Sequence, residues 1–223
     1  MIFRDRGHAG FSLAKELSAY RGDPTAVVLA LPRGGVVVGY EISRTLHLPL
    51  DVFITRKLST PDNPEYAIGA VSETGAIYLN SEAVDVFHLS HEDLEGLIQA
   101  QRREIARRQT LYRQGRAVPV LADHTVILVD DGIATGSTFF ATIEAVTELS
   151  PRRLVAAIPV GPRETLARVK SLVDELVVLE VPDPFSAVGN AYQDFTQIKD
   201  GQVVELLKAA QDAFYQRSYT SQT

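Results

Sequence analysis

Short apolar runs alternate along the chain with longer stretches in which apolar residues recur at helical spacing. The runs are rich in β-branched and aliphatic residues and are bounded by turn formers, which is typical of strands buried on both faces of a parallel sheet. They cover 26–31, 50–55, 126–129, 153–160 and 176–181. Helical patterns lie between most of them. The alternation predicts an α/β fold with a doubly wound, mainly parallel sheet of about five strands.

Residues 58–80 break this alternation. They have no helical period, and Pro61 and Pro64 stand near their start. The short apolar stretches 67–71 and 76–79 flank a turn at 72–75, a pattern that favours a hairpin. A long segment of this kind in a compact domain is usually functional or mobile.

A long helix is predicted from Ser90, an N-cap residue followed by an acidic first turn, to about Gln114. The residues expected to face inward are Leu94, Leu97, Ile98, Ile105, Leu111 and Tyr112. Arginines mark the other face, at positions 102, 103, 107, 108 and 113. We interpret that face as solvated or dimer-facing. A net charge of −6 argues against nucleic acid as a general partner.

Before the first strand, a helical pattern runs through Phe11, Leu13 and Leu17 and is broken by Gly22. It is preceded by the charged residues Arg4, Asp5 and Arg6, which we expect to pair with one another. The interpretation that assigns these residues no functional role is a capped helix that covers one edge of the sheet.

The stretch 125–138 carries the strongest chemical signal. A buried strand ends at two adjacent carboxylates, Asp130 and Asp131, and a loop bracketed by Gly132 and Gly136 leads into a helix. The free N–H groups and the dipole of a helix start favour an anion such as phosphate. Carboxylates favour hydroxyl donors or a hydrated cation. A ligand with a sugar diol near a terminal phosphate satisfies both halves.

A second strand–glycine loop–helix unit follows the first strand, at Pro32, Arg33, Gly34 and Gly35. Its glycines predict a second anion site at a helix start. Arg56 and Lys57 stand after the run 50–55, and ligands of open α/β sheets bind at the carboxyl ends of the strands. A tight turn and a solvated basic pair are the alternatives.

The run V-I-L-V-D-D-G-I-A-T-G-S-T resembles the phosphoribosyl-pyrophosphate (PRPP) signature of type I phosphoribosyltransferases. F-R-D-R-x-H-A-G and R-K-L-x-x-P-x-N-P-E-x-A-I-G-A-V are similar to stretches of an uncharacterised bacterial phosphoribosyltransferase group, so the resemblance covers nearly the whole chain. One departure is Gly132, where the family usually has an aliphatic residue.

The resemblance implies a role for each loop. Asp130 and Asp131 would hold the ribose hydroxyls, with Mg²⁺ bound nearby through PRPP, and together with Lys57 they are the expected catalytic residues. The residues expected to bind the 5′-phosphate are Ala134, Thr135, Gly136, Ser137 and Thr138. Those expected to bind pyrophosphate are Arg33, Gly34, Gly35 and Lys57.

The family also implies a hood, a segment that closes over the acceptor. Residues 58–80 would form its flexible loop, and residues 183–217 its C-terminal part and last helix. Glu65, Phe185 and Tyr192 are candidate acceptor contacts, although the two aromatics are equally compatible with pinning the last helix to the core. Enzymes for 6-oxopurines carry Asp at the position of Ala134, so hypoxanthine and guanine are disfavoured here.

These observations predict one domain over 1–223, with its core at about 25–182. The expected function is transfer of 5-phosphoribosyl from PRPP to a nitrogenous base or similar acceptor, with pyrophosphate released. The alternative is a PRPP-sensing regulator without transferase activity. The absence of cysteine excludes disulfides and thiolate metal sites. No apolar run is long enough for a membrane span, so we expect a cytoplasmic protein without a membrane partner; a homodimer is compatible with the basic helix face.

Overall fold

A computed structural model describes residues 2–60, 63–116 and 118–220, without the side chains of 63–66 and 217–220. Its central sheet has five parallel strands in the order β2-β1-β6-β7-β8. They are β1 (Ala26–Ala30), β2 (Leu50–Val52), β6 (Thr125–Val129), β7 (Arg153–Val160) and β8 (Glu175–Glu180). The predicted fold class is confirmed, because each strand begins in one of the apolar runs or beside it.

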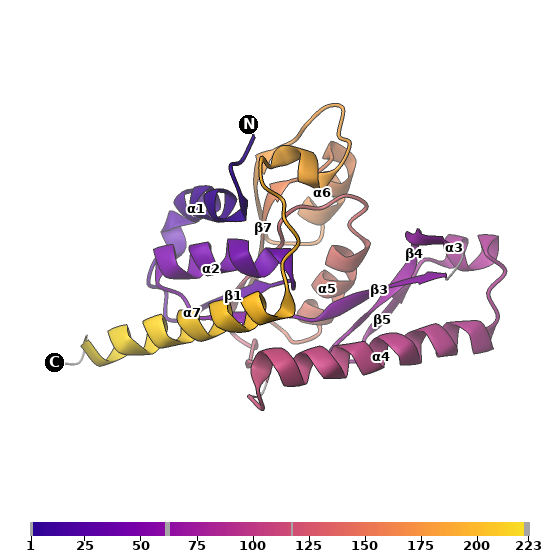
Figure 1. The fold of residues 1–223 in the computed structure, drawn as a ribbon, viewed down its shortest axis with the longest axis horizontal. Coiled ribbons are helices and arrows are strands. Elements are labelled where there is room, and N and C mark those ends of the chain that lie inside the picture. The colour runs from indigo at the N-terminus through magenta and orange to yellow at the C-terminus, as the bar shows by residue number, and fades with distance from the viewer. Residues whose placement is uncertain (1, 61–62, 117, 221–223) are drawn as a thin grey trace.

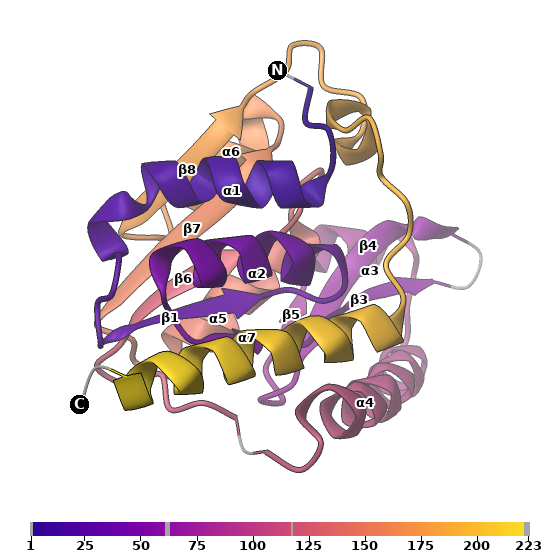
Figure 2. The same ribbon diagram turned by 60° about the vertical axis from the view of Figure 1, so that its left-hand side comes forward.

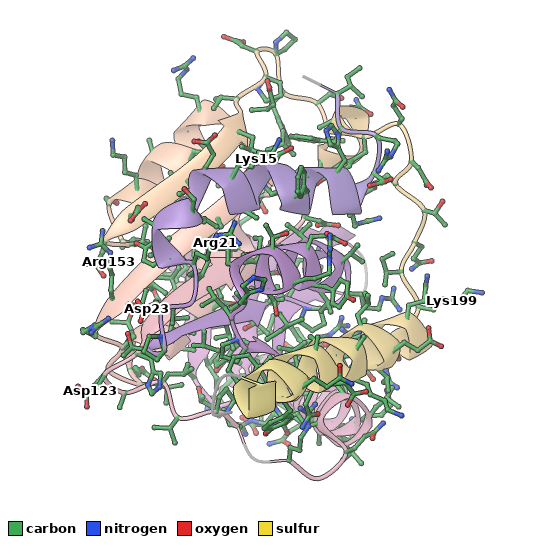
Figure 3. The ribbon with its side chains drawn as sticks, turned by 90° about the vertical axis from the view of Figure 1, so that its left-hand side faces the viewer. Lys15, Arg21, Asp23, Asp123, Arg153 and Lys199 are labelled. Atoms are coloured by element: carbon green, nitrogen blue, oxygen red, sulfur yellow. The ribbon has the colours of Figure 1, made fainter. Side chains whose placement is uncertain are left out.

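Helices cover both faces of this sheet (Figures 1 and 2). Alternate strand residues point to opposite faces, so Val28 packs under one pair of helices and Leu29 under the other. On the first face lie α1 (Arg6–Glu16) and α2 (Gly34–Leu46), and on the second lie α5 (Ser137–Thr147) and α6 (Arg163–Lys170). Charged side chains such as Lys15 and Arg153 point outward around the α1 face (Figure 3).

A second sheet of three antiparallel strands stands beside the first (Figure 1). It consists of β3 (Thr55–Thr60), β4 (Asn63–Ser72) and β5 (Ile77–Leu79). The hairpin expected between 67–71 and 76–79 is confirmed by the pairing of β4 with β5. The expected strand 50–55 is wrong at its end, because parallel pairing stops at Val52 and a new strand starts at Thr55. Arg56 and Lys57 therefore lie in the antiparallel sheet.

Two long helices close this side of the molecule, and α3 (Ser81–Val86) lies near the tip of the small sheet. The helix α4 (His91–Arg113) packs on β3 and β4, and α7 (Asp200–Thr220) packs on α2 and α4. Two short 3₁₀ helices, η1 (Ser18–Tyr20) and η2 (Val188–Ala191), complete the described elements. None of the helices in the described ranges is both long and apolar enough to span a membrane.

The arginine face of α4 is not a uniform solvated surface, which corrects the sequence interpretation. Arg108 and Arg113 are 8% and 2% exposed, whereas Leu111, expected to face inward, is 36% exposed. The guanidinium of Arg113 pairs with Glu73 and Asp51 and donates to the Val52 carbonyl at 2.7 Å. The physical reason is that α4 is covered by a sheet on one side and by α7 on another, so a wider arc of the helix is buried.

Candidate functional site

The two glycine loops meet because their strands are neighbours. Pairing of β1 with β6 continues past the sheet, where the Leu31 N–H donates to the Val129 carbonyl at 2.9 Å. A Cβ on Gly34 would overlap the Oδ2 atom of Asp131, and a Cβ on Gly35 would lie 2.9 Å from the Val129 carbonyl oxygen. Only glycine permits this approach. The loop at 32–35 thus lies directly against the acidic pair.

The other loop, 132–136, ends at Gly136, which is the N-cap of α5 and has a φ of +77°. A side chain there would be strained and would meet Phe140 and Thr165. The loop is also held by Thr165, whose hydroxyl donates to the Ala134 carbonyl at 2.8 Å. The first N–H groups of α5 consequently open toward a small cleft, as suits an anion.

That cleft has a volume of about 140 Å³. Its walls combine the expected 5′-phosphate loop with one expected ribose-binding carboxylate and one expected pyrophosphate-binding cation. The residues that line the cleft are Lys57, Asp130 and residues 132–139. The structure therefore brings these predicted residues together, although Lys57 reaches the cleft from the antiparallel sheet.

Gly132, the position that departs from the family pattern, has a φ of +149°. A Cβ there would overlap a methyl group of Val188 and lie 2.9 Å from one of Val160. Glycine fits this position because the 3₁₀ turn of the C-terminal segment packs directly on the loop.

The two carboxylates of the acidic pair differ in their surroundings. Asp131 accepts a hydrogen bond from Arg6 Nε at 2.7 Å, and both side chains are largely buried. The Oδ1 atom of Asp130 accepts from the Asp131 N–H at 2.8 Å. Burial, and next the charge of Asp131, raise the pKa of Asp130 well above its usual value. The charge of Arg6 opposes that rise.

Arg6 is the residue that sequence reasoning missed. Arg4 pairs with Asp5 as expected, but Arg6 turns to Asp131 and also donates to the Thr196 carbonyl at 2.9 Å. Its guanidinium carbon lies 3.8 Å from the centre of the Phe195 ring, a cation–π contact. The available signal was the motif F-R-D-R, which gives no hint of a partner so distant in sequence.

Tyr192 donates its hydroxyl to the Asp131 carbonyl at 2.6 Å and is 6% exposed. Its ring packs against Phe3 and Phe195, with centroids 5.4 and 5.0 Å away. These contacts favour the interpretation in which the aromatic anchors the C-terminal segment. Phe185 is half-buried against the same cluster. Glu65 lies in β4, but its side chain is outside the described part of the chain.

The Phosphoribosyl transferase domain profile matches residues 8–194. The chain belongs to the phosphoribosyl transferase domain family. Two Mycobacterium tuberculosis proteins named "Putative phosphoribosyl transferase" are each 40% identical over 213 residues, which is 96% of this chain and 48% of theirs. The chain thus spans about half the length of these curated relatives.

A solved structure of the Thermus thermophilus protein TT1426 is 42% identical, with a TM-score of 0.78. The match covers 93% of this chain and 98% of that one. The overall fold is therefore shared with this relative over nearly its whole length.

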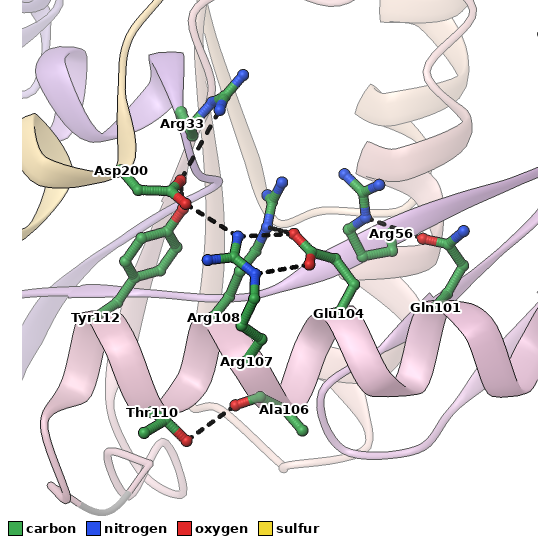
Figure 4. A network of polar contacts seen from close by, with 10 residues as sticks. All are labelled: Arg33, Arg56, Gln101, Glu104, Ala106, Arg107, Arg108, Thr110, Tyr112 and Asp200. Carbon is green, nitrogen blue, oxygen red and sulfur yellow. Dashed lines mark hydrogen bonds and ion pairs between the residues drawn. The ribbon is translucent and has the colours of Figure 1, made fainter.

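In this family member, the loop at 32–35 is also tied to the two long helices (Figure 4). Arg33 lies 3.8 Å from the Asp200 carboxylate at the start of α7. The same carboxylate accepts from the hydroxyl of Tyr112 at 2.6 Å and pairs with Arg107 at 2.9 Å, both on α4. Polar contacts thus connect the loop to elements far from it in sequence.

Proposed function

We propose that this chain is a PRPP-dependent phosphoribosyltransferase, which transfers 5-phosphoribosyl to a nitrogenous base or similar acceptor and releases pyrophosphate. The observation that carries the proposal is the contact between the glycine loop at 34–35 and the acidic pair 130–131, beside the start of α5. Two anion-binding loops separated by carboxylates match a ligand with a phosphate at one end, a diol in the middle and a diphosphate at the other.

In this proposal the 5′-phosphate lies against residues 134–138, where backbone N–H groups and the hydroxyls of Thr135 and Ser137 donate to it. The ribose hydroxyls donate to Asp130 and Asp131. Arg33, Gly34, Gly35 and Lys57 bind pyrophosphate. Catalysis is then mainly positioning and electrostatic stabilisation, as the bond from C1 to pyrophosphate breaks and the acceptor nitrogen bonds to C1. Contacts with the acceptor are assigned to Glu65 and Phe185.

Magnesium fits this site as an ion held largely by the ligand. One oxygen of each carboxylate is already engaged, that of Asp131 by Arg6 and that of Asp130 by a backbone N–H. The described residues contain no group of three His, Cys, Asp or Glu side chains that could cage a metal. Asp130 and Asp131 would complete the shell of an Mg²⁺ ion that keeps several waters. When bound, the ion would neutralise charge on the departing pyrophosphate.

Calorimetric titration with PRPP and Mg²⁺ tests the proposal. The wild type should bind with micromolar affinity, and the double variant Asp130→Asn/Asp131→Asn should not. Asp123→Asn is the matched control, since it makes the same chemical change at an exposed turn outside the site. A wild type that binds no PRPP would overturn the proposal.

A screen of nitrogenous acceptors then measures pyrophosphate release. Release with any of them supports the transferase. PRPP binding without release across the screen would favour the alternative, a regulator that senses PRPP.

A further inference from the structure

The five arginines of α4 occupy different environments. Arg102 and Arg103 are exposed, and Arg113 belongs to the buried cluster with Glu73. Arg108 is turned toward the protein, with 10% of its side chain exposed, and donates from Nε to Glu104 at 2.7 Å. Arg108 belongs to the polar network beside the loop at 32–35. Pyrophosphate binding by that loop, as proposed above, does not explain this network.

Two more guanidinium groups approach the same place. Arg56 comes from β3 and donates from Nε to Gln101 at 3.0 Å, and Arg33 comes from the loop at 32–35. The guanidinium groups of Arg33, Arg56 and Arg108 point away from the axis of α4 on one side of it (Figure 4). The terminal nitrogens of Arg56 and Arg108 donate to no residue in the described ranges, so their hydrogen-bonding forks are available to a ligand.

The charges in this cluster do not balance. Arg33, Arg107 and Arg108 pair with two carboxylates, those of Glu104 and Asp200, whereas Arg56 donates to the neutral Gln101. Among the side chains that the structure describes, four guanidinium groups of this cluster thus lie beside two carboxylates. Burial, and then the charge of Arg108, lower the pKa of Arg56, with a smaller contribution of the same sign from Arg33. Like charges held this close, in part out of water, favour binding of an anion.

We propose that Arg56 and Arg108 extend the pyrophosphate site: α4 delivers Arg108, and β3 delivers Arg56, to the diphosphate held by the loop at 32–35. The inference rests on the proposed function and adds two residues to it. A diphosphate suits the cluster better than a monophosphate does, because it carries at least two charges and several oxygens for planar guanidinium forks. The 5′-phosphate is accounted for separately by the start of α5.

Calorimetry with two separate probes tests this, inorganic pyrophosphate for the cluster and ribose 5-phosphate for the remainder of the site. Arg108→Gln should weaken pyrophosphate binding by about tenfold or more, the effect expected from losing a hydrogen bond to a charged group. Its affinity for ribose 5-phosphate should stay unchanged. Arg102→Gln, an exposed change on the same helix, should leave both affinities unchanged.

Arg108→Lys keeps the charge and loses the fork, so it should bind pyrophosphate between the wild type and Arg108→Gln. Arg56→Gln should act in the same direction as Arg108→Gln. Thermal unfolding of each variant establishes that it is folded under the titration conditions. Wild-type pyrophosphate affinity in folded Arg108→Gln and Arg56→Gln would overturn the inference, as would a wild type that does not bind pyrophosphate.

The two proposals fail in different ways. If the protein binds ribose 5-phosphate and its pyrophosphate affinity is the same in the wild type and in Arg108→Gln, the inference is overturned. The proposed function still stands in that case. Pyrophosphate binding that depends on Arg108, without binding of ribose 5-phosphate or PRPP, supports the cluster as an anion site and overturns the proposed function.

Discussion

Arg6 and Asp131 lie 125 positions apart in sequence, yet the Arg6 Nε is 2.7 Å from the Asp131 Oδ2 in a largely buried ion pair. The guanidinium is itself fixed by the Thr196 carbonyl and the Phe195 ring. Arg6 therefore holds one carboxylate of the acidic pair in place and supplies positive charge to both.

Arg6→Gln should weaken PRPP binding by about tenfold or more, because it removes a buried charged hydrogen bond. The substitution should also shift the pH dependence of PRPP binding. The charge of Arg6 lowers the pKa of Asp130, so its loss raises that pKa further and shifts the acidic limit of PRPP binding to higher pH. Titrations across pH 5–9 measure both effects. An unshifted pH profile would show that Arg6 acts by packing alone.

Asp130→Asn should stabilise the protein at neutral pH while abolishing PRPP binding. The folded-state pKa of Asp130 is raised by burial, so folding favours its protonated form. Stability therefore falls as pH rises from the ordinary carboxyl pKa of about 4 through the raised value. The neutral amide avoids that loss. Urea unfolding at pH 4 and pH 8 should give a difference between variant and wild type at pH 8 only.

Gly132→Ala should destabilise the fold by about 2–3 kcal/mol, since it combines a strained φ with a steric overlap on Val188. Val188→Ala in the same chain should recover part of the loss, because it removes the overlap but leaves the strain. A double-mutant cycle by chemical denaturation measures the coupling. Equal losses in the presence and absence of Val188→Ala would argue against the contact.

Arg113→Met should cost about 3–5 kcal/mol, because it leaves the carboxylates of Glu73 and Asp51 buried without their cation. Glu73 has no exposed side-chain surface. Arg102→Met, an exposed change on the same helix, should cost less than about 0.5 kcal/mol. Similar losses in the two variants would refute a special role for the buried cluster.

Glu104 should contribute to acid sensitivity. Hydrogen bonds from Arg107, and then from Arg108, lower its pKa to about 2 against the opposing effect of burial. A lowered pKa gives stability that is complete above the unfolded value, about 4.3, and lost as pH falls through the folded one. Glu104→Gln should be less stable than the wild type at pH 7 and equal to it below pH 2. Unfolding free energies over this range decide the point, and a constant difference at all pH values would contradict it.

Local sequence patterns predict the parallel sheet and both glycine loops because each of these features depends on residues that are consecutive in the sequence. The hairpin 67–71/76–79 was predictable for the same reason. Contacts between residues that are far apart in the sequence have no such local pattern. Nothing in F-R-D-R marks Asp131 as the partner of Arg6, and helical spacing alone could not separate the exposed Arg102 from the buried Arg113. The run 50–55 predicts a single strand because Phe53 and Ile54 are apolar and buried, whereas they connect the end of β2 to the start of β3.

The backbone near residue 192 runs beside the N-terminal segment, with hydrogen bonds from Phe3 to Ala191 and from Gln193 to Phe3. The ribosome synthesises residues 191–193 long after Phe3, and chains begin to fold from the N-terminal side as they emerge. A nascent chain that has reached residue 182 already contains all five parallel strands and both glycine loops. Arg6 gains its contacts with Phe195 and Thr196 only after those residues have been synthesised, so the acidic pair acquires its final geometry later than the sheet that carries it.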